Sequence, residues 1–280
     1  MEEYDSRISQ AKQAIKQADY IIIGAGSGLS TAAGLLYNGE KFEEDYKEFI
    51  EKYNFQDLYS ASFYNFKTQE EKWAFFAKMI KLNRYNEKPL KLYEELYKIV
   101  EDKEYFVLST NVDGQFYNSG FDENRIFEVQ GDYEYLQCEN ACHNKLYNNR
   151  KLVEKWIYNT QNCKIPSNLV MKCPVCGGNM DINLRKDANF VQDENWYKQS
   201  EKYKEFLSKT KNKNVVLLEI GVGFNTPGII RFPFEQMTAN NSKTILIRIN
   251  KYYPMPMLEI ENKTISFNED TNKIIEDLKE

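Results

Sequence analysis

The amino-terminal part of the chain changes from one hydrophobic period to another. Within residues 5–19, apolar side chains recur at Ile8, Ala11 and Ile15, close to the spacing of one face of an α-helix. The next stretch, "YIIIGAGSG" (20–28), is a short β-branched run that ends in glycines. The pattern predicts an amphipathic helix, followed by a buried strand and a tight turn.

Three later apolar runs have the same form. They are "YFVLSTNVDG" (105–114), "NVVLLEIGVGFN" (214–225) and "KTILIRIN" (243–250), and each ends in Gly, Asn or Asp. Helical or loop stretches separate the runs, including a mostly helical region from residue 42 to about 100. This alternation predicts a doubly wound α/β domain with a Rossmann-like parallel sheet. Ligands of such sheets bind just outside the carboxyl ends of the strands.

The segment 133–190 does not follow this rhythm. It holds all five cysteines and many Asn and Tyr residues. We therefore expect two parts: a Rossmann-like large domain formed by residues 1–132 and 191–280, and a small inserted zinc-binding module at 133–190.

Composition narrows the class of protein further. The 280 residues are 42% hydrophobic and 28% charged, as in ordinary soluble globular proteins. A net charge of −5 without a cluster of Lys and Arg argues against a nucleic-acid partner. The polar start and the short apolar runs predict no targeting peptide and no membrane partner, and hence a cytoplasmic protein.

The loop Gly24–Ser30 is a candidate phosphate site. Its glycines lack the Cβ atoms that would keep backbone N–H groups away from a diphosphate, although such turns also occur without any ligand. A dehydrogenase would need an acidic residue after a second strand to hold the ribose. The acidic residues at that distance, 43–45, lie instead in a helical pattern. A plain Rossmann dehydrogenase is therefore disfavoured.

Four of the cysteines have metal-ligand spacing. Cys138 and Cys142 form C-x3-C, and Cys173 and Cys176 form a C-x2-C turn that is followed by glycines. This pattern predicts one structural zinc ion with four thiolate ligands, and the alternative is free thiols. His143 could be a substitute ligand or lie outside the ligand shell. Cys163 has no partner at ligand spacing.

The glycine loop, the polar strand ends and the cysteine pairs, in their order along the chain, resemble the motifs of the sirtuin family. The resemblance covers nearly the whole chain. "GSGLSTAAGL" (26–35) resembles the nucleotide loop of the family, "TNVDG" (110–114) its T-Q-N-x-D-G, and "GVGFN" (221–225) its ribose and adenine segment. The resemblance implies NAD as co-substrate, a zinc ribbon, and Asn111, Asp113 and Gln130 as catalytic residues. The NAD-binding positions that it implies are Ala25, Gly26, Ser27, Gly28, Ser30, Asn111, Asp113, Gln130, Gly221, Gly223, Phe224, Asn225 and Asn250.

Two departures from the family pattern point to one branch. Most sirtuins carry Pro-Asp-Phe-Arg where this chain has residues 36–39, and a histidine base where it has Gln130. Three segments resemble the bacterial macrodomain-linked sirtuins of class M: "DLYSASFYNF" (57–66), "EEKWAFFAKMI" (70–80) and "QGDYEYLQC" (130–138). That branch implies a protein ADP-ribosyltransferase that modifies a lipoylated glycine-cleavage H-like carrier protein in a redox response, with a macrodomain hydrolase in the same pathway.

The chemistry of position 130 favours the same activity. Deacylation by sirtuins needs a base to deprotonate a ribose hydroxyl, and a glutamine amide has no usable proton affinity. Transfer of ADP-ribose to a protein nucleophile asks less of this residue. The alternatives are an NAD glycohydrolase, an NAD-sensing module without activity, and a weak protein deacylase. At "TNVDG" the alternative is a simple Asx turn, and Arg185 could contact a carrier, a phosphate or only a surface carboxylate.

Overall fold

The computed structural model describes residues 3–35, 39–85 and 89–279. Its contacts divide the chain into two compact units. The first unit comprises Met1–Gly34, Pro89–Gln130 and Glu194–Glu280, and the second comprises Leu35–Lys88 and Gly131–Asp193. The 131–193 segment lies close to the small module expected at 133–190. The helical segment 35–88, which the sequence analysis placed in the large domain, belongs to the second unit.

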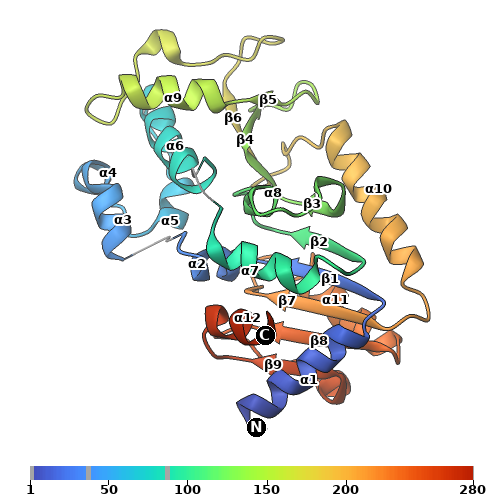
Figure 1. Cartoon of the computed structure of the whole chain (residues 1–280). Helices are drawn as coiled ribbons and strands as arrows, with labels where there is room; N and C mark the ends of the chain where they lie inside the picture. Colours follow the sequence, from blue (N-terminus) through green and yellow to red (C-terminus); the bar gives the residue numbers. More distant parts are fainter. Residues whose placement is uncertain (1–2, 36–38, 86–88, 280) are drawn as a thin grey trace. The chain divides into compact units, whose positions relative to one another are not determined.

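The first unit is built on a six-stranded sheet with the order β3-β2-β1-β7-β8-β9. All neighbouring strands are parallel (Figure 1). The strands are β1 (Tyr20–Ala25), β2 (Tyr105–Ser109), β3 (Ile126–Glu128), β7 (Val215–Ile220), β8 (Thr244–Ile249) and β9 (Thr264–Phe267). The four predicted strands are confirmed, and β3 and β9 are additional edge strands.

Helices connect these strands. They are α1 (Tyr4–Gln17), α2 (Ser27–Ala32), α7 (Lys91–Val100), α8 (Gln115–Asn118), α10 (Glu194–Lys209), α11 (Arg231–Asn240) and α12 (Thr271–Lys279), with 3-10 turns η1 (Glu123–Arg125) and η3 (Leu258–Lys263). The predicted amphipathic helix at 5–19 is α1, and it buries Ile8, Ala11 and Ile15.

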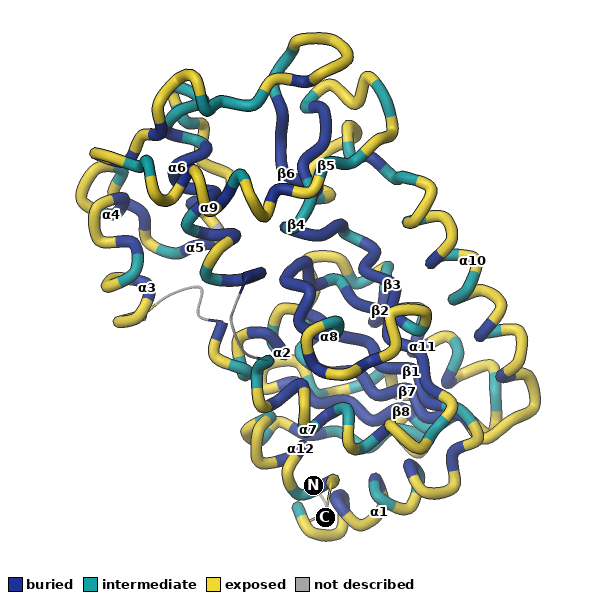
Figure 2. The backbone as a smooth tube through the Cα atoms, turned by 45° about the horizontal axis from the view of Figure 1, so that its top comes forward, coloured by how far each residue is buried: buried dark blue, intermediate teal, exposed yellow. Residues whose placement is uncertain are grey.

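The two faces of the sheet bury separate cores. Alternate residues of a strand point to opposite faces, so Ile21 and Ile23 pack with α1, α7 and α12, whereas Ile22 packs with α10 and α11. Figure 2 shows the central strands β1, β7 and β8 as largely buried stretches. A parallel sheet covered on both faces is the predicted doubly wound α/β architecture, and this prediction is confirmed.

The second unit combines helices with a small antiparallel sheet. The sheet has the order β5-β4-β6. Its elements are α3 (Glu40–Asp45), α4 (Lys47–Tyr53), α5 (Leu58–Ser62), α6 (Gln69–Asn83), β4 (Gly131–Cys138), β5 (Tyr147–Asn148), α9 (Arg150–Asn159), η2 (Ser167–Leu169) and β6 (Met180–Leu184). Helices α6 and α9 are joined by stacked Trp73 and Trp156, whose ring centroids lie 4.8 Å apart. The carboxyl end of β4 delivers Cys138 to the cysteine-rich loops.

Candidate functional site

The order of the sheet fixes where a ligand of the first unit can bind. β1 lies between β2 and β7, so the chain winds outward in opposite directions from the β1–β7 pair. At such a switch point, the loops after adjacent strands separate and leave room for a ligand at their carboxyl ends. The polar and glycine-rich sequences after β1, β2 and β7 all lie at this edge of the sheet.

The glycines after β1 and β7 pack backbone against backbone. A Cβ atom added at Gly26 or Gly28 would lie 2.6 Å from the oxygen or the Cα atom of Gly221. Gly221 has a φ of +64°, and a Cβ there would lie 2.3 Å from the nitrogen of Leu29. The N–H of Gly28 donates to the carbonyl of Gly221 at 3.0 Å, and that of Gly26 donates to Ile220. These glycines are therefore needed for the contact between the two loops, a reason that the phosphate interpretation did not include.

The loop after β2 is tied to the loop after β1 by two buried side chains. Asn111 donates from Nδ2 to the carbonyl oxygen of Gly26 at 3.0 Å. Ser30 donates to the Asp113 carboxylate at 2.5 Å, and the hydroxyl groups of Ser30 and Tyr93 lie 3.1 Å apart. The N–H of Gln115 donates to the other Asp113 oxygen at 3.2 Å, so the Asx turn is also present. Asn111 and Asp113 thus fix the shape of two strand-end loops.

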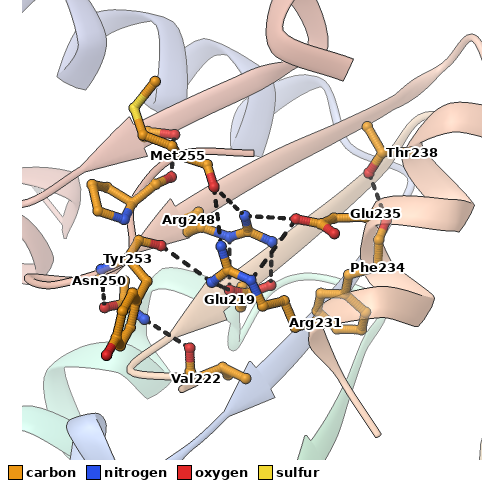
Figure 3. A network of polar contacts seen from close by, with 12 residues as sticks. Glu219, Val222, Arg231, Phe234, Glu235, Thr238, Arg248, Asn250, Tyr253 and Met255 are labelled. Carbon is orange, nitrogen blue, oxygen red and sulfur yellow. Dashed lines mark hydrogen bonds and ion pairs between the residues drawn. The ribbon is translucent and has the colours of Figure 1, made fainter. Parts of the chain in front are cut away.

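Asn250 ties the loops after β7 and β8 in the same way. Its Nδ2 donates to the carbonyl of Val222 at 2.7 Å, and its Oδ1 accepts the N–H groups of Tyr252 and Tyr253 at 3.1 and 3.0 Å (Figure 3). Phe224 is exposed, makes an edge contact with the Tyr253 ring at 5.0 Å, and lies under the Arg231 guanidinium.

Gln130 follows β3 and is the last residue of the Pro89–Gln130 segment of the first unit. The N–H of Val129 donates to Ser109, which holds this segment beside β2. The half-buried Gln130 side chain donates from Nε2 to Thr226 Oγ1 at 3.2 Å. Gln130 therefore contacts the loop that follows β7, which is the segment that the resemblance assigns to the ribose.

Beneath these loops lies a buried ion cluster that the sequence analysis missed. Arg248 of β8 makes a bidentate contact with Glu219 of β7, at 2.7 and 3.0 Å, and a further contact with Glu235 of α11 at 2.9 Å (Figure 3). Arg231 adds a second guanidinium, and it donates to the carbonyls of Tyr253 and Met255 at 3.1 and 3.0 Å.

The cluster anchors the loop after β8. Burial raises the pKa of the Glu219 carboxyl, and the adjacent Arg248 cation opposes this shift. Because Arg248 also donates to the carbonyl of Met255 at 3.0 Å, the same charges that stabilise one another hold the 250–255 backbone. A signal was present in the sequence: one charged residue interrupts each of the apolar runs "VVLLEI" and "TILIRI", at paired positions of adjacent strands.

In the second unit, four cysteine sulfur atoms converge. Cys138 and Cys176 lie 3.7 Å apart, as do Cys142 and Cys173. Zinc–sulfur bonds of about 2.3 Å in a tetrahedron separate the sulfur atoms by about 3.8 Å. The spacing therefore fits one structural zinc ion, as the cysteine pattern predicted.

The surroundings of the Cys173 thiol favour the form that binds a metal. Burial raises the pKa of the Cys173 thiol, but hydrogen bonds from the backbone N–H groups of Cys176 and Val175 outweigh this effect and lower the pKa to about 6. The thiolate is the form that binds a metal. Burial and hydrogen bonds with the neighbouring cysteines raise the pKa of the Cys142 thiol, so within this cluster the Cys173 sulfur holds its proton least tightly. Cys163 is buried elsewhere in the unit, in a turn at Gln161–Lys164.

Comparisons with known proteins agree with this arrangement. No protein-family model matches the chain. A curated protein of Staphylococcus aureus named protein ADP-ribosyltransferase is 35% identical over 98% of this chain and 88% of its own length. A curated Fusarium oxysporum protein, named probable bifunctional ADP-ribose hydrolase/ADP-ribosyltransferase, is 30% identical over 86% of this chain and 42% of its own length.

Solved structures of sirtuins share the fold. A mutant Sir2 homologue in complex with ADP-ribose has a TM-score of 0.61, with 13% identity over 100% of this chain and 95% of that chain. A Sir2 homologue in complex with NAD has a TM-score of 0.60, with 13% identity over 97% of this chain and 92% of that chain. The chain belongs to the sirtuin-type protein ADP-ribosyltransferases. Its Rossmann-like unit is accompanied by a second unit whose cysteine cluster fits a zinc ion.

In this sirtuin-type chain, the predicted NAD-binding residues all lie in the first unit. The structure brings them to the carboxyl edge of one sheet, from β1 and from the loops after β1, β2, β3, β7 and β8. Ser27 and Asn225 are exposed there, whereas Ala25 is buried at the end of β1. Their roles toward NAD stay predictions.

Other candidate positions of the sirtuin-type chain have different outcomes. Of residues 36–39, which stand where most sirtuins carry Pro-Asp-Phe-Arg, 36–38 lie outside the described residues. Arg185 is exposed directly after β6 in the second unit. No helix within residues 3–35, 39–85 and 89–279 is long and apolar enough to cross a bilayer.

Proposed function

We propose that this protein is an NAD-dependent protein mono-ADP-ribosyltransferase whose acceptor is a lipoylated glycine-cleavage H-like carrier protein. The name of the Staphylococcus relative supports protein ADP-ribosyl transfer. Complexes of sirtuin neighbours with ADP-ribose and NAD support NAD as the donor. The carrier rests on the class M resemblance of residues 57–66, 70–80 and 130–138.

The observation that carries the proposal is that a glutamine, which is not a base, occupies position 130. The chain has one histidine, His143, which contacts Cys142 and Tyr147 in the second unit. Position 130 holds a glutamine, and its amide donates to Thr226. An amide can orient a hydroxyl group or a nucleophile but cannot remove its proton. The site therefore favours transfer to a protein nucleophile over sirtuin deacylation.

The other strand-end residues would hold and orient the donor. Bound NAD would supply the ADP-ribosyl group, with nicotinamide as the leaving group. Asn111 and Asp113 are fixed against the Gly26–Ser30 loop, so they would present a rigid polar edge to the ribose and the carboxamide. Asn250 fixes the loop that contains Phe224, the residue expected near the adenine.

Pairing with a macrodomain hydrolase is the second part of the proposal. The Fusarium relative carries both activities in its name, ADP-ribose hydrolase and ADP-ribosyltransferase. A hydrolase that removes the modification would make the transfer reversible. Four thiolates would hold the zinc without an open coordination position, so we assign it a structural role.

The test is transfer of labelled ADP-ribose from NAD to the purified lipoylated carrier, followed by mass spectrometry of the intact carrier. We expect the carrier to gain one ADP-ribosyl group with wild-type enzyme. Gln130→Ala should lower the rate about tenfold or more, because a positioning hydrogen bond is lost. Gln10→Ala is the matched control, since Gln10 is exposed on α1, where it donates to Ser6, and its loss should leave the rate unchanged.

Three results would contradict the proposal. Rapid release of free ADP-ribose without any protein acceptor would identify an NAD glycohydrolase. Efficient removal of acyl groups from lysine peptides would show that position 130 does not need a base. Tight NAD binding with no release of nicotinamide would indicate a sensor.

A further inference from the structure

The histidine beside the second cysteine is directed toward the sulfur cluster. His143 Nδ1 lies 3.1 Å from Cys142 Sγ and 3.9 Å from Cys173 Sγ. Its other ring nitrogen, Nε2, lies 2.9 Å from the hydroxyl group of Tyr147. The ligand atoms of Cys138, Cys142, His143 and Cys173 all lie within 4.8 Å of one another. His143 is therefore an alternative to Cys176 for the fourth ligand position.

The distances favour Cys176 as the ligand. Cys176 Sγ lies 3.7 Å from Cys138 Sγ, close to the edge of a zinc–sulfur tetrahedron. A nitrogen and a sulfur bound to the same zinc ion, at about 2.05 and 2.3 Å, would lie about 3.5 Å apart. The distance of 3.1 Å between His143 and Cys142 is shorter than that, and it suits a hydrogen bond to sulfur.

The negative charge of a metal-bound Cys142 thiolate then determines which groups donate the hydrogen bonds. A metal-bound thiolate has no proton and can only accept a hydrogen bond. Nδ1 must therefore carry the proton that it shares with Cys142. In a neutral imidazole this leaves Nε2 as an acceptor, and the Tyr147 hydroxyl group must donate to it.

We propose that Tyr147 and His143 form a hydrogen-bond relay that ends on the Cys142 thiolate and retains the zinc ion. The relay lies outside the four sulfur ligands. Outer partners of this kind orient a ligand and strengthen metal binding. The proposal concerns metal retention and does not depend on the reaction that the enzyme catalyses.

The fold places both members of the relay. Tyr147 lies on β5, where it pairs with Leu136 of β4, near the carboxyl end of the strand that delivers Cys138. The loop between β4 and β5 carries Cys142 and His143. The Tyr147 ring meets the His143 ring edge to face, with centroids 5.7 Å apart, which restricts rotation of the imidazole. The sheet thus fixes the orientation in which Nδ1 faces the sulfur atom.

The test measures zinc release from the full-length protein to an excess of a coloured chelator, with metal content determined by mass spectrometry. Wild type and the His143 and Tyr147 variants should bind one zinc ion per chain. His143→Ala should release zinc about 10- to 100-fold faster, the usual cost of losing an outer partner. Tyr147→Phe should also release zinc faster, because it loses the hydroxyl group that donates to His143. The substitution keeps the aromatic ring. His143→Asn should restore slow release, since its amide places a donor near the position of Nδ1.

Tyr158→Phe is the matched control, because Tyr158 on α9 is 88% exposed and should not affect release. Cobalt substitution separates the relay from direct ligation. The absorption bands of the cobalt protein should indicate four thiolates in both wild type and His143→Ala. A change of these bands in His143→Ala, with none in Cys176→Ala, would make His143 a ligand and overturn the proposal. Equal release rates for wild type, His143→Ala and Tyr147→Phe would also overturn it.

Discussion

Gly221 is constrained both by its backbone conformation and by close packing. Its φ of +64° lies in the left-handed region, and the space that a side chain would occupy is filled by the backbone of Gly28 and Leu29. Gly28 in turn faces Gly221, so the loops after β1 and β7 cannot move apart without breaking the Gly28–Gly221 hydrogen bond. The contact between the β1 and β7 loops is therefore sensitive to a single methyl group.

We expect Gly221→Ala to destabilise the protein by about 2 kcal/mol or more, because strain at φ and a backbone clash act together. NAD binding should weaken in parallel, since the clash moves both loops. Gly228→Ala is the control: a Cβ there meets nothing within 4 Å, and its stability should change by less than about 0.5 kcal/mol. Urea unfolding followed by circular dichroism measures both variants. Equal stability of the two variants would show that the β1–β7 loop contact is not tight.

At the scale of residues, the sequence could predict features that depend on neighbouring positions, but not contacts between distant positions. Asn111 and Asp113 could be singled out because polar residues directly follow an apolar run. Their partners, Gly26 and Ser30, lie more than eighty positions away in the sequence, so the bonds themselves leave no local pattern. For the same reason, the sequence favoured phosphate approach as the reason for the glycines and did not reveal their packing against Gly221.

At the scale of elements, apolar runs identified β1, β2, β7 and β8, because a buried parallel strand is apolar on both faces. β3 and β9 lie at the sheet edges and are only three and four residues long, too short for a recognisable period. A mostly helical region was also predicted after residue 42, but no local pattern indicates which unit a helix joins. The association of 35–88 with the second unit therefore required the tertiary contacts, such as the Trp73–Trp156 stack.

The Glu219–Arg248 pair joins three elements, β7, β8 and α11, and so allows a prediction at this scale. Glu219→Gln keeps the shape of the side chain but removes one of the negative charges around two buried guanidinium groups. We expect the free energy of unfolding to fall by about 3 kcal/mol, since the loss of one partner leaves a buried charge poorly compensated. The 250–255 loop should also exchange amide protons faster, because Arg248 and Arg231 hold its carbonyls.

Glu205→Gln provides the comparison. Glu205 on α10 pairs with Lys209 at 2.8 Å, but both side chains are exposed to solvent. An exposed pair contributes about 0–1 kcal/mol, so this variant should resemble wild type in both measurements. If Glu219→Gln were as stable as Glu205→Gln, the cluster would not be what anchors the loop after β8.

At the scale of the whole molecule, different interactions stabilise the interior of each unit. The first unit buries a continuous apolar core on each face of its sheet. In the second unit, the loops 139–146 and 172–179 are exposed or half-buried except at Cys173, so little apolar burial stabilises them. Bonds from four thiolates to one ion are the strongest interaction available to these loops, and metal binding in such sites contributes directly to folding.

Removal of the metal should therefore act on one unit and spare the other. We expect chelation of the intact protein to increase hydrogen exchange in the loops 139–146 and 172–179 and in the adjoining end of β4, with β1 and β7 unchanged. Added zinc should reverse the effect, whereas magnesium should not, because it prefers oxygen ligands. Exchange measured by mass spectrometry resolves these segments. If β1 and β7 lost protection together with the cysteine loops, the two units would unfold as one, and the independence of the Rossmann-like core would have to be given up.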